Sequence, residues 1–330
     1  MNAASSLDPQ VFRHQILERR SRLEAAAGAI SPDYLHALLE EIDSALDRIG
    51  NGTFGLCETC HDPIERDRLE ANPLVRFCID HLSQSEARAH EQDLQLATQI
   101  QSRLLPAPTV ALEGWETHYL YESAGPVGGD YCEVLALEDG RSLFFAVGDV
   151  AGKGVAASLL MTHLNAIFRS LLSLNLPIPE VMARANRLFC ESTLTAQYAT
   201  LVCGRATGSG VEFCNAGHCP PLLVRRNGIQ RIDAPGLPLG LFCGGEYPPA
   251  HVEFGEGDSL ILYSDGITES RDPAGDEFGE DGLARSLEKN SAGGCASLAQ
   301  GVLQDVERFR DGGRPTDDVT LLVVRRRQLN

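Results

Sequence analysis

The sequence lacks any long apolar run. No stretch of the 330 residues approaches the ~18 uninterrupted apolar residues of a membrane-spanning helix, so no span is predicted. The N-terminal segment MNAASSLDPQVFRHQ also lacks the basic region and apolar core of an export signal. These absences predict a cytoplasmic protein, in which the ten cysteines are not expected to form disulfides.

Long basic runs are absent as well. VRRRQ at 324–328 is a small basic end, while the formal net charge is -18. A surface with this excess repels nucleic acid and favours cations or basic partners, although solubility explains most of it. Hydrophobic residues make up 43% of the chain, an ordinary share for a globular protein, and the length suggests two domains.

Two helices are predicted at the start of the chain. The first covers residues 8–28, and the second begins at Ser31 in SPDYLHALLEEIDSALDRIGNG. Apolar residues recur in the second at spacings of three and four: Leu35, Leu38, Leu39, Ile42, Leu46 and Ile49. We predict a helical hairpin over residues 1–56, whose stripe buries the two helices against each other or against a second chain.

A pattern of cysteine and histidine follows the hairpin. Two residues separate Cys57 from Cys60, two separate Cys78 from His81, and 17 lie between the pairs. This spacing is typical of a closed tetrahedral zinc site with three thiolates and one imidazole, which is structural rather than catalytic. His61 is a weaker rival ligand, because its place beside Cys60 suits a turn residue better.

The segment GTFGLCETCHDPIERDRLEANPLVRFC, within residues 31–82, resembles the zinc finger of the DksA/TraR family. That family has a helical element before the finger and typically a fourth cysteine where this chain has His81. Its members act on RNA polymerase through an acidic coiled-coil tip, whereas the tip here is the short AAAGAISPD. We therefore expect one structural zinc ion in a finger over residues 57–81, without the polymerase activity.

A polar linker helix is predicted over residues 82–106. Its narrow apolar stripe consists of Leu94, Ala97, Ile100 and Leu104. Such a stripe on a charged helix suits a two-helix coiled coil, and it equally suits docking on the helix's own domain. We predict a homodimer through this helix, with a passive spacer as the alternative.

From residue 107 onward the pattern changes to short strands with turn signals. The candidate strands are THYLYES, YCEVLALE, SLFFAVGD, ATLVCGRA, GVEFCNAG, PPLLVRR, DSLILYSD and DVTLLVVR. Two helices are predicted near 154–173 and 179–195. Tight turns such as LEDGRS favour antiparallel sheets, and the grouping of strands apart from helices predicts an α+β fold for residues 107–330.

Acidic residues stand at the ends of these strands: Asp130, Asp149, Asp265 and the pair Asp317 and Asp318. Each alone is most simply a turn residue or a helix cap. Four such places in one domain favour a shared site, in which carboxylates repel one another unless a cation neutralises them. Hard oxygen ligands select magnesium or manganese, and two such ions can activate water and hold a phosphoryl group.

The motifs LLPAP, GPVGGDYCEV, VGDVAGKGVAASLLM, CNAGHCPPLLV, GLPLG, LILYSDGITE and DDVTLLVV follow in this order. With them, residues 107–327 resemble the metal-dependent protein phosphatases of the phosphatase 2C class, in the bacterial RsbU/SpoIIE branch of sporulation and stress-response regulators. The resemblance implies a β-sandwich of two antiparallel sheets flanked by helices. It also implies two or more Mn(II) or Mg(II) ions.

The resemblance implies a role for most of the acids. Asp149 would bridge two metal ions, and the backbone carbonyl of Val150 would ligate one of them. Asp265 and Asp317 would complete the protein ligands of the second ion. Asp130 would orient metal-bound water or aid a further ion.

Some positions stay open at this point. Asp318 competes with Asp317 as the metal ligand, and Asp317 ranks higher because related enzymes often carry an amide at the second position. Lys153 is either a phosphate contact or part of a turn before the helix at 154, with the turn slightly favoured. His218 has the residue type of a catalytic group, but a structural turn histidine is the better prediction.

The chain departs from eukaryotic phosphatases of this class at Ala151, where they have a histidine proposed as general acid, and in having no match to their phosphate-binding arginine. We predict a protein serine/threonine phosphatase that uses a metal-activated water and forms no covalent intermediate. Its substrate would be phosphoserine or phosphothreonine on a regulatory protein, with an anti-sigma factor antagonist as one candidate. The alternative is a transcription-associated binding protein that acts through the DksA/TraR-like module, and a third hypothesis has that module control catalysis through the linker helix.

Overall fold

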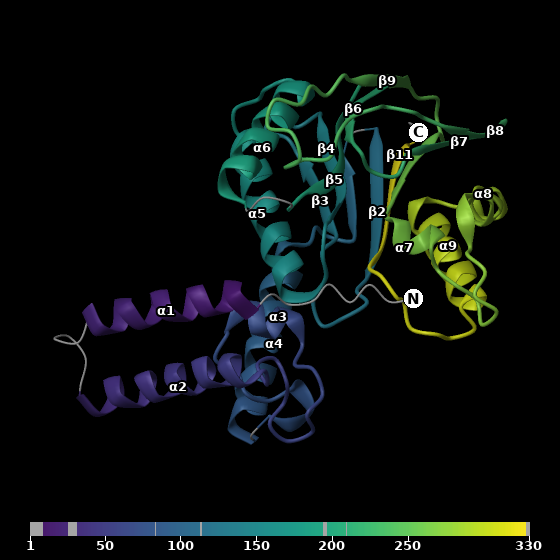
Figure 1. Cartoon of the computed structure of the whole chain (residues 1–330). Helices are drawn as coiled ribbons and strands as arrows, with labels where there is room; N and C mark the ends of the chain where they lie inside the picture. The colour runs from purple at the N-terminus through teal and green to yellow at the C-terminus, as the bar shows by residue number, and fades with distance from the viewer. Residues whose placement is uncertain are drawn as a thin grey trace. The chain divides into compact units, whose positions relative to one another are not determined.

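The computed structural model describes residues 9–25, 32–82, 84–112, 114–193, 197–208 and 210–327. The chain forms two units, Met1–Asp93 and Leu94–Asn330 (Figure 1). Residues 1–8 and 26–31 of the predicted hairpin lie outside the described residues. The boundary falls within one continuous helix, so this helix contributes residues to both units.

The first unit begins with a pair of helices that lie side by side (Figure 1). Its elements are α1 (Pro9–Ala25), α2 (Pro32–Asn51), α3 (Arg66–Ala71) and the 3-10 turn η2 (Ile79–His81). Ile16 of α1 packs against Ile42 and Ala45 of α2 in a small buried cluster, and Arg20 pairs with Asp43 at 2.6 Å on the surface. The prediction of two N-terminal helices is therefore confirmed.

A buried arginine joins α2 to the loops that follow it. The guanidinium of Arg48 donates hydrogen bonds to the carbonyl oxygens of Leu74 and Val75, at 3.1 and 2.8 Å. Buried charged groups are costly unless their donors are satisfied, and these carbonyls satisfy two of them. The end of α2 is thereby fixed to the segment that leads into Cys78.

The second unit contains two antiparallel sheets. The six-stranded sheet has the order β1 (Thr109–Leu112), β2 (Trp115–Glu122), β11 (Val319–Arg326), β10 (Ser259–Tyr263), β7 (Leu222–Arg225) and β8 (Gly228–Arg231). The five-stranded sheet has the order β3 (Tyr131–Ala136), β4 (Leu143–Val150), β5 (Ala199–Thr207), β6 (Gly210–Ala216) and β9 (Ala250–Glu253). Strands β4, β10 and β11 are buried along nearly their whole length, which explains their continuous apolar runs.

Helices cover the outer face of each sheet. The helices of this unit are α4 (Gln84–Leu104, shared with the first unit), α5 (Gly154–Leu172), α6 (Ile178–Ser192), α7 (Asp265–Thr268), α8 (Gly279–Asn290) and α9 (Cys295–Phe309). One core lies between the two sheets, a second lies between the five-stranded sheet and α5 with α6, and a third lies between the six-stranded sheet and α8 with α9. The predicted α+β sandwich flanked by helices is confirmed.

The sequence analysis missed several elements of this unit. Helices α8 and α9 were not predicted, and neither were the four-residue strands β1, β8 and β9. The short strands are half-exposed edge or hairpin strands with weak alternation. The two helices follow one another across the glycine-containing SAGG turn, and each becomes a helix by packing its apolar stripe on the sheet.

Two helices differ from what their apolar residues suggested. Helix α5 is long and apolar enough to cross a membrane by length and composition, but Met161, Leu164 and Phe168 pack into the core under it, which makes it a core helix. In α4, Ile100 of the predicted stripe is 48% exposed, and the buried residue beside it is Gln101. At this turn of α4, the buried position is therefore Gln101 rather than the predicted Ile100.

Candidate metal centres

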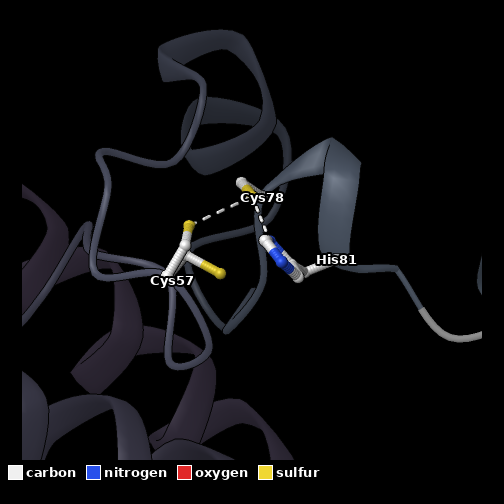
Figure 2. A group of neighbouring side chains, drawn as sticks. Cys57, Cys78 and His81 are labelled. Atoms are coloured by element: carbon white, nitrogen blue, oxygen red, sulfur yellow. Dashed lines mark hydrogen bonds between the residues drawn. The ribbon is translucent and has the colours of Figure 1, made fainter.

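Four soft donors converge in the first unit. The donor atoms of Cys57, Cys60, Cys78 and His81 all lie within 4.8 Å of one another, and Figure 2 shows Cys57, Cys78 and His81 pointing toward a common point. The Sγ atoms of Cys60 and Cys78 are 3.8 Å apart, and Cys78 Sγ lies 3.2 Å from His81 Nδ1. Two sulfurs on a zinc tetrahedron, each at about 2.3 Å from the ion, are about 3.8 Å apart. The donor set therefore fits a closed zinc site.

Local backbone turns build this site. The N–H of His61 donates to the Cys57 carbonyl at 2.9 Å, and His61 has a φ of 61°, which is the left-handed conformation of a turn residue. Burial raises the pKa of Cys57, but hydrogen bonds from the backbone N–H groups of Cys60 and Cys78 help to lower it to about 6. Backbone N–H groups aimed at a sulfur favour the thiolate form that binds metal, while His61 serves the turn.

The acidic residues of the second unit come from both sheets. Asp149 lies in β4 and Asp130 directly precedes β3 in the five-stranded sheet, whereas Asp265 follows β10 and Asp317 comes shortly before β11 in the six-stranded sheet. Asp265, Asp317 and Asp318 all act electrostatically on Asp149. The strand ends identified in the sequence therefore meet at one end of the sandwich.

Mutual repulsion at this end changes the acid strengths. Burial, followed by repulsion from Asp265 and Asp317, raises the pKa of Asp149 to about 7. Burial and repulsion from Asp317 also raise the pKa of Asp265. Asp130, 2% exposed, has its pKa raised chiefly by burial, while a hydrogen bond from the Thr320 hydroxyl opposes the shift. A cluster of hard oxygen donors whose negative charges repel one another fits Mg²⁺ or Mn²⁺.

The acid cluster is wider than the finger. Among the residues that the structure describes, only the finger brings three or more such donor atoms within 4.8 Å of one another. An ion among the acids would therefore need water and backbone oxygen to complete its shell, as is usual for Mg²⁺.

The two adjacent aspartates have different surroundings. Asp318 is buried, and its carboxylate accepts the N–H groups of Ala124 at 2.9 Å and Gly129 at 2.6 Å. The Asp317 side chain is 43% exposed and accepts a hydrogen bond from Lys153 Nζ at 2.8 Å. Asp318 thus organises backbone, whereas the more exposed Asp317 carboxylate pairs with Lys153.

Two glycines allow the loop before β3 to pass close to the acids. A Cβ on Gly129 would lie 3.1 Å from the Val150 carbonyl oxygen and 3.5 Å from Asp149 Oδ1. A Cβ on Gly128 would lie 2.1 Å from Asp318 Oδ2, closer than atoms can approach. Any side chain at Gly128 would therefore displace the loop that carries Asp130.

Lys153 lies at the acid cluster. It precedes α5 as its N-cap, as the turn interpretation expects, and its ammonium also donates to the Thr316 carbonyl at 3.0 Å and to Asp317. It is one of only two lysines in the chain, beside 26 arginines. A compact, rotatable ammonium at this place is therefore compatible with both interpretations of Lys153.

His218 is part of a turn. Its N–H donates to Asn215 Oδ1, and its Nδ1 pairs with the Thr200 hydroxyl, both at 2.8 Å. Burial lowers its pKa to about 4, so the ring is neutral at physiological pH. Ala151, at the position of the eukaryotic histidine, contributes its backbone N–H to the Tyr198 carbonyl at 2.9 Å.

Sequence reasoning missed two residues around Asp130. Thr320, two positions after Asp318, points its hydroxyl to Asp130 Oδ2, and the alternation of side chains in DDVTLLVV would have placed Thr320 and Asp318 on the same face. Gln101 bonds to the loop before Asp130. No signal in the sequence pointed to it, because the apolar stripe favoured Ile100.

Two family descriptions match the chain. Residues 139–327 match "Stage II sporulation protein E (SpoIIE)", and residues 52–80 match "Prokaryotic dksA/traR C4-type zinc finger". The second match ends one residue before His81.

Known proteins are similar to this chain over most of its length. Protein IcfG of Synechocystis sp. is 25% identical over 264 residues, 71% of this chain and 41% of IcfG, so this chain spans less than half of that relative. Phosphoserine phosphatase RsbU of Bacillus subtilis is 24% identical over 241 residues, 72% of this chain and 71% of RsbU. The solved SiaA-PP2C domain of Pseudomonas aeruginosa aligns with a TM-score of 0.63 and 19% identity, over 74% of this chain and 99% of that domain, which shows the fold.

Proposed function

The chain belongs to the stage II sporulation protein E family, and on that premise we propose that it is a metal-dependent protein serine/threonine phosphatase. The observation that carries the proposal is the meeting of Asp130, Asp149, Asp265 and Asp317 at one end of the sandwich, with repulsion that raises the pKa of Asp149 to about 7. The relative RsbU is named a phosphoserine phosphatase, which supports this substrate class.

We assign the metal ligands as follows. Asp149 and the backbone carbonyl of Val150, together with Asp265 and Asp317, would hold two Mn(II) or Mg(II) ions, with Asp149 shared between them and Asp265 and Asp317 serving the second. Asp130 would orient water at the centre. When bound, such ions lower the pKa of water and neutralise phosphoryl oxygens. The glycine loop against Val150 and the exposure of the Asp317 carboxylate support this assignment.

Lys153 is assigned to the substrate phosphate. Its ammonium lies beside Asp317 at 2.8 Å and its side chain is 67% exposed, so it can meet a phosphate that approaches the acids from solvent. An ion bound to Asp317 would release the ammonium from that carboxylate.

The N-terminal module is assigned a structural zinc ion, held by Cys57, Cys60, Cys78 and His81. The donor distances and the match to a zinc-finger family support this. We divide the chain functionally into a hairpin (1–56), finger (57–81), linker helix (82–106) and catalytic domain (107–330).

The substrate is proposed to be a regulatory phosphoprotein in the cytoplasm, with an anti-sigma factor antagonist as the first candidate to test. The alternative function, a transcription-associated protein acting through the finger module, is favoured by one observation, the match of residues 52–80 to the dksA/traR finger. Binding of purified protein to RNA polymerase, with and without the intact finger, distinguishes the two.

A homodimer through α4 is also proposed. Leu96 and Ile100 lie one turn apart on this helix and are 56% and 48% exposed, which supports a second apolar contact besides the one on the catalytic domain. Replacement of both by lysine should halve the mass measured by light scattering, and an unchanged mass would make the helix a spacer.

The activity itself is tested with the full-length protein. Purified enzyme should release phosphate from a phosphoserine protein and from an aryl phosphate in Mn²⁺ or Mg²⁺, and a chelator should stop the release reversibly. Failure on a panel of phosphoserine and phosphothreonine proteins, with metal bound, would reject the proposal.

A further inference from the structure

A buried glutamine connects the linker helix to the catalytic loop. Gln101 is 5% exposed although α4 is largely polar. Its side-chain Nε2 donates to the Gly128 carbonyl at 2.7 Å, and the Gly128 N–H donates to its Oε1 at 3.1 Å. One amide side chain therefore satisfies both backbone groups of one residue, in the way that a neighbouring strand would.

A second contact one turn earlier supports the first. The Thr98 hydroxyl lies 2.9 Å from the Pro126 carbonyl oxygen and 2.8 Å from the Leu94 carbonyl oxygen of its own helix. The last turns of α4 thus follow the loop from Pro126 to Gly128. Ile100, between the two contact residues, faces solvent.

The same loop is held from the other side by Asp318. Its carboxylate accepts the N–H groups of Ala124 and Gly129, and no side chain fits at Gly128 between the Asp318 carboxylate and the Tyr121 hydroxyl. The loop therefore has little room to move while both Gln101 and Asp318 are in place. Asp130 follows Gly128 by two residues, so its position depends on both anchors.

We propose that Gln101 is a positioning residue of the catalytic centre, which holds Gly128 so that the loop presents Asp130 to the other acids. The catalytic role of Gln101 in this inference rests on the proposed function. Loss of the amide would leave both backbone groups of Gly128 without their buried partner, and unsatisfied buried groups are costly enough to make the loop rearrange. Gln101 and Thr98 both bring the second-unit part of α4 against this loop.

The test uses the full-length protein and a matched pair of substitutions. Gln101→Leu keeps the approximate shape of the side chain and removes both hydrogen bonds, and Gln99→Leu makes the same change at an exposed position of the same helix. Gln101→Glu keeps only the acceptor for the Gly128 N–H. Amide hydrogen exchange of the segment 124–130, Mn²⁺ affinity by calorimetry, and kcat and KM on an aryl phosphate are measured for each.

For Gln101→Leu we expect exchange of residues 124–130 to rise about tenfold, Mn²⁺ binding to weaken, and kcat to fall while KM stays within about twofold. Gln101→Glu should give intermediate exchange, and Gln99→Leu should match the wild type. If Gln101→Leu does not fold, Thr98→Val replaces it and should speed exchange of the same segment to a smaller degree.

Equal exchange and equal Mn²⁺ affinity in Gln101→Leu and Gln99→Leu would overturn the proposal. A wild-type protein without phosphatase activity would instead overturn the proposed function, while exchange and Mn²⁺ affinity would still decide whether Gln101 positions the loop.

Discussion

The two candidate metal centres are built in opposite ways. The finger takes its donors from residues 57–81, and they lie within 4.8 Å of one another. The acid centre takes its residues from 130 to 317, across both sheets, and its carboxylates are held near one another by the sandwich. The finger is thus expected to need its ion in order to fold, whereas the acid centre is made by the fold and bears a repulsion that an ion relieves.

The largest expected effect is on catalysis. Asp149→Asn or Asp265→Asn should lower kcat by orders of magnitude, because each removes a charge that holds the ions. Asp233→Asn, on the surface, should have no effect. Circular dichroism should show that the fold is retained, because these substitutions relieve repulsion. Wild-type rates in both active-site variants would remove the acid centre from the mechanism.

The second effect concerns the finger. A Cys57→Ser/Cys60→Ser variant should lose about one zinc ion per chain by elemental analysis and lose folded structure in the first unit, because closed sulfur-rich sites contribute directly to folding. The thermal transition of the second unit should persist. A variant that retains a full equivalent of zinc would show that other donors hold it.

The third effect is a dependence of the stability of the second unit on pH, which is expected from the acid centre. The folded-state pKa of Asp149, about 7, lies above the unfolded value of about 3.9. The metal-free second unit should therefore be most stable at low pH, lose stability as pH rises from about 4 to about 7, and level off above pH 7. Thermal denaturation in chelator from pH 5.5 to 8.5 measures this.

Two controls accompany the pH series. Mn²⁺ should restore stability at pH 8, and Asp149→Asn should flatten the dependence. A metal-free protein whose stability does not fall between pH 5.5 and pH 7 would argue that these carboxylates are already compensated.

The smallest expected effect is that of Lys153→Met. If the ammonium contacts the substrate phosphate, KM for a phosphoprotein should rise about tenfold, the loss expected for one charged hydrogen bond. Lys289→Met is the matched control. Lys289 of α8 is the other lysine of the chain, and it likewise pairs with an aspartate, Asp305 of α9, at 2.7 Å. Equal KM values for the two variants would leave Lys153 with its turn role alone.

The fold could be predicted from the sequence where patterns are local. All eight candidate strands from THYLYES to DVTLLVVR are strands in the structure, because continuous apolar runs between turn signals have few alternatives. Helices α8 and α9 were missed, because their apolar stripes are buried only by packing against the six-stranded sheet. The sequence ranked Asp317 above Asp318 as the metal ligand, but the different surroundings of the two carboxylates could not be predicted, because they depend on contacts far away in the chain.

The sequence by itself determined the finger donors and the set of acids, because a two-residue spacing and a carboxylate at a strand end are local properties. Only the tertiary structure decided which residues support the acids. Asp318 holds backbone through a contact with Gly129, 189 positions away in the chain, and Gln101 rather than Ile100 faces the loop before Asp130. These contacts depend on the rotation of one helix and the register of two sheets, which are set by packing over the whole domain.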